Sequence, residues 1–409
     1  MIERNFDDMR NESIEDRSVM SRVKRVNPLV LFLVVYLGYN VTGLIDTPWT
    51  LSNIYDKSLC WNLFLTGLSG FVVAAVIFRQ RCRRQIETAL RRRTSLQLTI
   101  FFFLVFSACL LSTILLSGGI PLFLGEERFG NSALAFNVAQ LYGFWVLVRL
   151  ISDIEHGAKI SPLQSTVYLI GVLCFGYRTP ILIFAFVILV YLIAFRVSVQ
   201  KAVVLGIIAI LAIVGFAAIF AAYRVSQNYD LVLFFKNIDF RFINDHKYLL
   251  PFVPALAMFD FSQNTVSSIG SALHEHMHGQ LFLSNYETFL PGKHWGARNI
   301  IGSLTGARWV AGRPMSITPT LQGALYVDFG YIGVFIGSFA ISAGISMLGR
   351  LARNFGALGK FSFCYLLTLC IMAVHNGYWD VGFVFFVLFI VIIRVFDSIR
   401  AISYSSRQS

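Results

Sequence analysis

Basic side chains recur at the edges of apolar segments in this chain, beside glycine or proline or at the start of a long polar stretch. They are Arg128, Arg178, Arg224, Lys293 and Arg298. An Arg at a bilayer edge is costly to desolvate, and its planar fork of N–H donors matches phosphate oxygens. We therefore predict that these residues bind an anionic group such as a lipid diphosphate. The alternative is that each one snorkels to lipid headgroups or caps a helix, an alternative that is weakest for Arg178 inside an apolar hairpin.

One acidic residue lies within an apolar segment. Asp328 stands just inside a predicted membrane span, in the run Gly323 to Gly330. An ionised carboxylate at this depth requires a partner or a function, and we expect the partner to be an outer Arg. The functional interpretations are a general base toward a sugar hydroxyl or the orientation of a binding Arg. The alternative is a structural ion pair.

A short histidine-rich segment matches the pattern H-E-x-x-H. On a helix, this spacing directs His274 and His278 at one zinc ion, with Glu275 as the base. A zinc metalloprotease also needs a third ligand, for which Glu287 and Asp328 are only loose candidates, and a cleft that admits a peptide. The alternative is a polar loop surface whose His side chains hydrogen-bond sugar hydroxyls. A membrane zinc protease is therefore the second hypothesis.

Long apolar blocks must position these residues. The chain has 409 residues, 56% of them hydrophobic, and the apolar residues are grouped rather than dispersed. A membrane span takes about 20 apolar residues. This criterion predicts ten spans, at 28–45, 59–78, 95–117, 132–151, 163–177, 179–196, 202–223, 321–348, 361–376 and 381–397. The predicted fold class is all-α, a polytopic transmembrane helical bundle with one large outer loop.

Two of these spans come from one apolar run. Gly176-Tyr177-Arg178-Thr179-Pro180 interrupts that run with a glycine, a charge and a proline, which together indicate a turn.

Basic segments set the predicted orientation. Residues 22–25, 79–93 and 350–360 are rich in Arg and Lys and fall on one side of the ten spans, which the positive-inside rule makes cytoplasmic. Both termini are then cytoplasmic in a multi-pass protein of the inner membrane, and the first span is a retained signal anchor. The predicted regions are a polar arm at 1–27, spans 1–7 in 28–223, an outer loop at 224–320, spans 8–10 in 321–397 and a tail at 398–409. Apolar runs in the loop, such as 249–259, predict short interfacial helices.

Several function classes are excluded or disfavoured. The net charge of +12 lies mostly beside apolar blocks, which indicates topology and not nucleic-acid binding. No G-x-x-x-x-G-K-[ST], Rossmann G-x-G-x-x-G or G-x-S-x-G pattern is present, which disfavours ATP-driven transport, use of a nucleotide sugar and serine hydrolysis. The spans hold few charges and the polar residues gather at their outer ends, which favours interfacial chemistry over an ion-coupled transporter or a lipid-linked glycan exporter.

The chain resembles the Wzy-type oligosaccharide repeat unit polymerases, also called O-antigen polymerases. Four segments carry the resemblance, in the family's order between Gly118 and Gly337. They are Gly118-Gly119-Ile120-Pro121-Leu122-Phe123 with Arg128, Gly176-Tyr177-Arg178-Thr179-Pro180, Phe289-Leu290-Pro291-Gly292-Lys293 with Arg298, and Ser316-Ile317-Thr318-Pro319-Thr320 running into Gly323-Ala324-Leu325-Tyr326-Val327-Asp328-Phe329-Gly330. The first and last spans match the family only in hydropathy.

The resemblance implies a metal-independent, inverting-type glycosyltransferase without a cofactor, acting on polyprenyl-diphosphate-linked oligosaccharides at the outer face of the inner membrane. The product would be a surface polysaccharide such as O-antigen, capsule or exopolysaccharide. Carried onto this sequence, Arg128, Arg178 and Arg298 would bind the diphosphate, and His278 or Asp328 would be the base. A chain-length regulator and a flippase of the same pathway are expected partners. A glycan ligase would also work through such an outer loop, transferring the finished glycan to another acceptor, and it is a further alternative.

Overall fold

The computed structural model of this chain describes residues 26–44, 56–78, 96–124, 133–177, 179–226, 263, 265–288, 295–306, 309–310, 313–314, 316–354, 356–379 and 381–405. Helices form nearly all of it. The membrane-type helices are α2 (Pro28–Leu44), α3 (Lys57–Ile77), α4 (Leu96–Leu116), α5 (Ala133–Glu155), α6 (Pro162–Cys174), α7 (Thr179–Tyr191) with the π-helical turn η3 (Leu192–Arg196), α8 (Val199–Ser226), α14 (Thr320–Asn354), α15 (Ala357–Asn376) and α16 (Gly382–Ser405).

Shorter elements lie between α8 and α14 and between α4 and α5. They are the 3₁₀ turn η1 (Pro121–Phe123), a helical segment at 265–272, α12 (Gln280–Glu287), α13 (Ala297–Leu304) and the strands β1 (Trp309–Val310) and β2 (Arg313–Pro314). The two strands pair antiparallel, with Trp309 opposite Pro314. The short helices α12 and α13 confirm that the predicted loop contains helices, whereas the run 249–259 lies outside the described residues.

The ten predicted apolar segments each coincide with one membrane-type helix. Within the described residues, seven helices are long and apolar enough to cross a membrane, and shorter apolar helices lie at Pro28–Val41, Pro162–Cys174 and Val199–Ala209. The fold class is therefore confirmed: the chain is a polytopic helical membrane protein.

The predicted turn between the fifth and sixth segments is present. α6 ends at Cys174 and α7 begins at Thr179, with Pro180 in the first turn, where its missing N–H costs no helical hydrogen bond. Gly176 has φ +76°, a left-handed conformation that glycine adopts without a steric penalty. The Gly-x-x-x-Pro sequence thus separates two helices that hydropathy alone would merge.

Aromatic side chains and small residues hold the bundle together. Rings of α5, α15 and α16 interlock around Phe144, Tyr365 and Phe389, which are buried. Where α3 crosses α14, a Cβ added to Gly70 would lie 2.4 Å from the Phe335 carbonyl oxygen, so only glycine permits this approach. Packing of this kind drives association where lipid removes the hydrophobic force. Large apolar side chains such as Leu116, 82% exposed in the isolated chain, are then left to face lipid.

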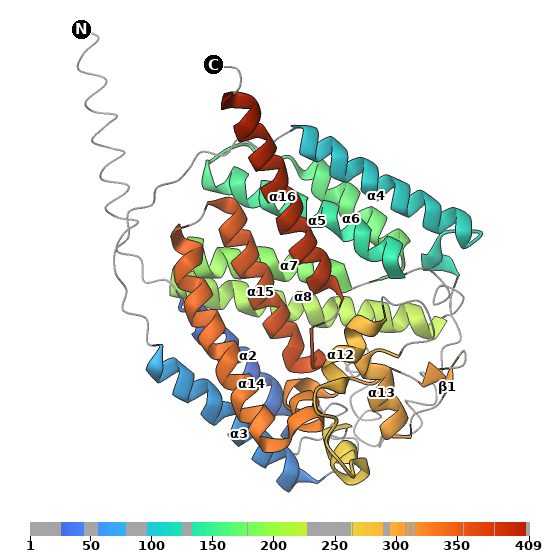
Figure 1. Cartoon of the computed structure of the whole chain (residues 1–409), viewed down its shortest axis with the longest axis vertical. Helices are drawn as coiled ribbons and strands as arrows, with labels where there is room; N and C mark the ends of the chain where they lie inside the picture. The colour runs from blue at the N-terminus through green and yellow to red at the C-terminus, as the bar shows by residue number, and fades with distance from the viewer. Residues whose placement is uncertain are drawn as a thin grey trace.

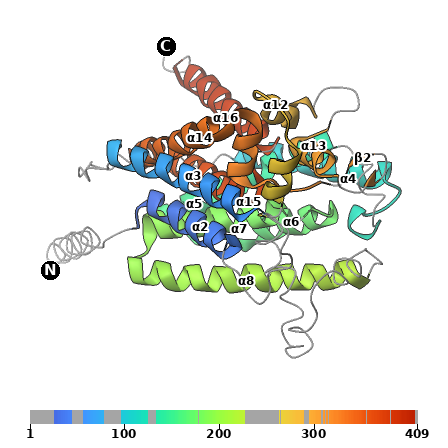
Figure 2. The same cartoon turned by 90° about the horizontal axis from the view of Figure 1, so that it is seen from below.

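The two ends of the bundle differ. At one end, hereafter the loop end, α12 and α13 pack beside the N-terminal part of α14, and the strand pair lies against α13 (Figures 1 and 2). α16 runs toward the other end, hereafter the ion-pair end, where Glu155, Arg196 and Lys360 meet. α15 connects the two ends, since it begins near Lys360 and ends at Asn376 close to α14.

Candidate functional site

Asp328, in α14, accepts hydrogen bonds from several segments at the loop end. Its side chain is 0% exposed, and Oδ1 accepts hydrogen bonds from the backbone N–H groups of Gly279 (3.1 Å) and Leu281 (3.0 Å). Oδ2 accepts from the N–H of Phe282 (3.0 Å) and from the hydroxyl of Tyr378 (2.7 Å). These backbone groups belong to the first turn of α12, whose N–H groups have no partner inside the helix. Asp328 therefore caps α12 from a distant part of the chain, with the negative charge at the positive end of the helix.

Tyr378, in the connection between α15 and α16, is the fourth donor to Asp328. Asp328 with its donors at Gly279, Leu281, Phe282 and Tyr378 is hereafter called the Asp328 anchor. Its hydroxyl lies 2.7 Å from Asp328 Oδ2 and 3.1 Å from the carbonyl oxygen of Ala324, and its ring packs edge-on against Phe282. Burial and the neighbouring Asp328 carboxylate raise the pKa of Tyr378 well above its ordinary value. The phenol therefore stays protonated and acts as a donor, and it ties the α15–α16 connection to both α12 and α14.

α14 is broken beside the anchor. Gly330 has φ +64° and ψ −156°, which interrupts the helical hydrogen bonds. The carbonyl oxygens of Val327 and Asp328, freed by the break, accept instead from the N–H groups of Met277 and His278, both at 2.9 Å. Helix breaks at membrane depth are tolerated when other groups satisfy the freed backbone in this way.

Gly330 suits the break through its left-handed conformation, and a side chain there would also require the exposed His276 ring to shift. A Cβ added to Gly330 would lie 2.8 Å from Nε2 of His276, whose ring also packs edge-on against Tyr326. The stretch from His276 to Phe282 thus lies along α14 through backbone, ring and carboxylate contacts.

The H-E-x-x-H match is not helical. His274 and Glu275 form a bend after the helical segment 265–272, and His278 lies in a turn with φ +49°. All three side chains are exposed, and among the described residues no group of three His, Cys, Asp or Glu side chains could hold a metal ion. The helical presentation that a zinc protease requires is therefore missing here.

The predicted anion-binding residues are covered unequally by the described structure. Arg298 lies in the first turn of α13, half-buried, with its carbonyl oxygen accepting from the N–H of Ile317 at 3.0 Å. Arg224 lies in the last turn of α8, and its side chain is not described. Arg128, Arg178 and Lys293 lie outside the described residues. Arg298, His278 and Asp328 are thus the predicted site residues that the structure brings to the loop end.

α12 and α13 are fixed to each other and to the bundle through Asn285. Its side-chain oxygen accepts from the N–H of Ala297 at 2.9 Å, at the start of α13, and its side-chain nitrogen donates to the carbonyl of Trp379 at 3.3 Å. This arrangement orients the first turn of α13, which carries Arg298. Nothing in the spacing of the sequence indicates it.

An outer Arg is the predicted partner of Asp328, and the donors that the described residues supply to it are of another kind. Its two oxygens are bound by three backbone N–H groups and one phenol. The reason is geometric: the break at Gly330 brings the loop backbone against α14, and the start of a helix supplies donors with a fixed direction.

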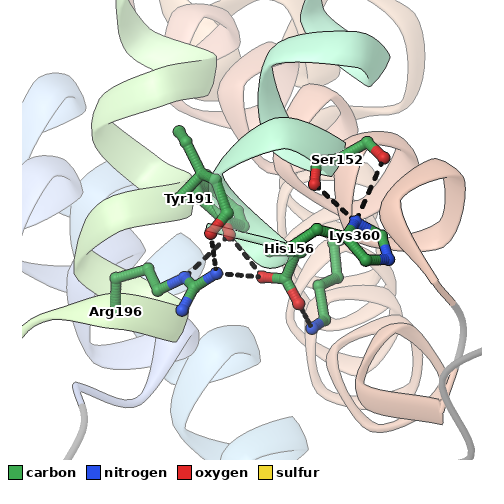
Figure 3. Close-up of polar contacts among 7 residues, drawn as sticks. Ser152, His156, Tyr191, Arg196 and Lys360 are labelled. Carbon is green, nitrogen blue, oxygen red and sulfur yellow. Dashed lines mark hydrogen bonds and ion pairs between the residues drawn. The ribbon is translucent and has the colours of Figure 1, made fainter. Parts of the chain in front are cut away.

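The ion-pair end holds polar residues that sequence analysis did not single out. Glu155 bonds to Lys360 Nζ at 2.5 Å, lies 3.4 Å from Arg196 Nη2 and accepts a hydrogen bond from Tyr191 (Figure 3). Arg196 also donates to Tyr191 at 2.9 Å and to the Ile154 carbonyl at 2.6 Å. Residues of α5, η3 and α15 thereby meet at one point.

Comparison with known proteins gives one match. Residues 27–388 match the family model described as "Putative O-antigen polymerase", which covers most of the chain and nearly all of its described helices. No curated protein matches the chain, and no solved structure matches it.

Proposed function

The chain belongs to the O-antigen polymerase family, whose members polymerise repeat units into polysaccharide in the membrane, and from this premise we propose its substrate, its working face and the roles of its residues. The proposed substrate is a polyprenyl-diphosphate-linked oligosaccharide repeat unit. The observation that carries the proposal is the family match over residues 27–388, because the residues predicted to bind the diphosphate fall within it.

The proposed working face is the outer face of the inner membrane, at the loop end. Two observations support this orientation. The helix ends at Glu155, Arg196 and Lys360 contact one another, so three connections predicted to be cytoplasmic share one side. The basic residues between helices are concentrated on that side, as the positive-inside rule requires of the cytoplasm. The loop of residues 224–320, both termini and the domain boundaries given above are assigned on the same basis.

The proposed reaction transfers the growing glycan to the next repeat. The acceptor hydroxyl attacks the anomeric carbon, its O–H bond breaks, and a new glycosidic C–O bond forms. The C–O bond to the diphosphate breaks with its electron pair leaving on the polyprenyl diphosphate. Because the diphosphate already activates the donor, the reaction uses no nucleotide, cofactor or metal.

Basic side chains are proposed to stabilise the leaving group. Arg298 stands on a helix whose first turn is fixed by Asn285 and Ile317, so its backbone is held in place before substrate arrives. We propose that Arg298, with Arg128, Arg178, Arg224 and Lys293, surrounds the diphosphate oxygens where charge develops in the transition state. Preorganised donors of this kind are worth about 100-fold or more in rate each.

We propose that Asp328 positions α12 and does not itself contact the substrate. Its oxygens are occupied by four donors and it is buried, so an acceptor hydroxyl has no access to it. It orients α12 and, through Asn285, the helix that carries Arg298. His278 is exposed at the same end and is proposed to contact the acceptor glycan.

The test is elongation by purified protein. Wild type, Arg298→Ala and Arg298→Lys are supplied with a lipid-linked repeat and no nucleotide or metal, and glycan length is followed on gels. We expect elongation by wild type, loss of about 100-fold or more in Arg298→Ala and incomplete recovery in Arg298→Lys, which lacks the planar fork. Absence of elongation by wild type with every repeat supplied would overturn the proposal, and transfer to a different acceptor without elongation would indicate a ligase.

A further inference from the structure

Tyr39 and His375 form a hydrogen-bonded pair at the loop end. The Tyr39 hydroxyl and His375 Nδ1 are 2.6 Å apart, and the two rings meet edge-on with centroids 5.7 Å apart. Tyr39 lies in α2 and His375 in the last turn of α15, and both side chains are half-buried. They are 336 positions apart in the sequence, so the fold alone brings these two proton-transfer groups together.

The backbone around Tyr39 is held by a buried amide network. The neighbouring Asn40 is 0% exposed; its nitrogen donates to the Tyr36 carbonyl at 2.8 Å, and its oxygen accepts from the side chains of Gln322 and Gln263. Buried amides within spans are costly unless paired between helices, and here they join α2 to α14. The last turns of α2 are therefore fixed, and Tyr39 with them.

His375 stands directly before the Asp328 anchor. α15 ends at Asn376, Gly377 takes φ +90°, and the next residue, Tyr378, donates to Asp328. The Tyr39–His375 pair is thus three residues from the anchor that positions α12. The last turn of a helix also stabilises a cation through its unpaired carbonyl groups, which suits a ring that must hold an added proton.

The two residues that the resemblance offers as the base, Asp328 and His278, lack these features. Asp328 is occupied on both oxygens. The His278 side chain is exposed, and the contact the structure gives this residue is made by its backbone N–H. A general base benefits from a second group that fixes its orientation and shares the proton, and the Tyr39–His375 pair supplies both parts.

We propose that Tyr39 and His375 together take the proton from the acceptor hydroxyl; this inference rests on the proposed function. As the acceptor oxygen bonds to the anomeric carbon, its proton passes to the Tyr39 oxygen. The Tyr39 hydroxyl proton passes to His375 Nδ1, and the imidazole becomes imidazolium. The electron pair of the broken glycosyl–phosphate bond leaves on the diphosphate, and the imidazolium returns its proton to solvent after product release.

The test measures elongation and substrate binding in the same purified proteins. Tyr39→Phe removes one oxygen, and His375→Gln retains a polar side chain of similar reach; His375→Ala opens space for added imidazole. The matched controls are Tyr331→Phe on the surface of α14 and His156→Gln at the ion-pair end. Binding of the lipid-linked repeat and the thermal unfolding midpoint in detergent show whether a variant folds.

We expect Tyr39→Phe and His375→Gln to lower the turnover rate about 100-fold with unchanged affinity for the lipid-linked repeat. Imidazole should restore part of the activity of His375→Ala and none of the activity of Tyr39→Phe, which a purely structural role would not produce. Elongation by Tyr39→Phe at the wild-type rate would overturn the inference alone. Failure of wild type to elongate any repeat would overturn the proposed function and this inference with it.

Discussion

Asp328 and Glu155 are carboxylates near opposite ends of the bundle, and they are held by different chemistry. Asp328 receives three backbone N–H groups and a phenol, all electrically neutral. Glu155 receives two cations, Lys360 and Arg196, together with the phenol of Tyr191. One end therefore fixes a loop by hydrogen bonds to a helix start, and the other joins helices by ion pairs.

The difference suits the work proposed for each end. Backbone N–H groups at a helix start have a fixed direction, so Asp328 sets the position of α12 to within hydrogen-bond tolerance. Long cationic side chains reach a carboxylate from several directions, so Glu155 tolerates small shifts of its helices. We therefore expect the contacts at the loop end to position reacting groups, and the ion pairs at the other end to hold the helices together. Four substitutions test this contrast, ordered by expected effect.

Asp328→Ala should have the largest effect. It removes four hydrogen bonds to a buried charge and leaves three N–H groups of the α12 start without their acceptor, at a cost of about 4 kcal/mol. We expect amide hydrogen exchange over residues 279–282 to accelerate roughly 1,000-fold and elongation to be lost. Asp328→Asn keeps the shape of the side chain and one acceptor, so its exchange rate should lie between those of wild type and Asp328→Ala. Unchanged exchange in Asp328→Ala would show that α12 is held by other contacts.

Glu155→Ala should rank second and act on the other end. Lys360, 8% exposed at its side chain, would lose its carboxylate, and the cost should be about 2–3 kcal/mol because Glu155 is itself 21% exposed. The unfolding midpoint in detergent should fall, while elongation per folded molecule stays near wild type. Adding Lys360→Met should recover part of the loss, since the buried cation that has lost the Glu155 carboxylate is then gone. A double variant less stable than Glu155→Ala would contradict the ion-pair account.

Tyr378→Phe should have a smaller effect at the loop end. Tyr378 is the one side-chain donor to Asp328 among the described residues; its loss leaves the backbone donors in place and should cost about 1–2 kcal/mol. Exchange over residues 279–282 should accelerate about tenfold, well below the effect of Asp328→Ala. An effect as large as that of Asp328→Ala would mean that the tyrosine, rather than the α12 start, holds the carboxylate.

Glu275→Gln should have the smallest effect. Glu275 is exposed in a bend, so we expect a change in stability below about 0.5 kcal/mol and elongation at the wild-type rate. Metal analysis of the purified protein is the companion measurement. Stoichiometric zinc that is lost on His274→Ala, together with an inactive Glu275→Gln, would revive the protease hypothesis.

The sequence predicts the helices better than the contacts between them. The ten apolar segments follow from hydropathy, and each coincides with a helix of the structure. The turn at Gly176 follows from the glycine and proline around it. The break at Gly330 does not follow, because it depends on N–H groups of Met277 and His278 that only the folded loop supplies. The sequence predicts that Asp328 needs a partner, but three of the four donors described for it are backbone N–H groups, which no residue type can signal.

Pairs distant in the sequence were missed for a similar reason. In the sequence, Arg196 and Lys360 are basic residues near helix ends and Glu155 is an acidic residue near another, and no pattern links the three. Their convergence depends on the packing of α5, α7 and α15. Tyr39 and His375 likewise carry no local pattern, and their contact follows from the packing of α2 on α15.

The break at Gly330 bears on how the chain is assembled in the membrane. Residues 277–282 are synthesised before residues 327–330, so the loop backbone already exists when α14 enters the bilayer. Until the two segments meet, the freed carbonyl groups of Val327 and Asp328 and the ionised side chain lack their partners in a poorly hydrated environment. Insertion of α14 and docking of the loop are therefore coupled, and a substitution that releases the loop should also lower the yield of correctly inserted protein.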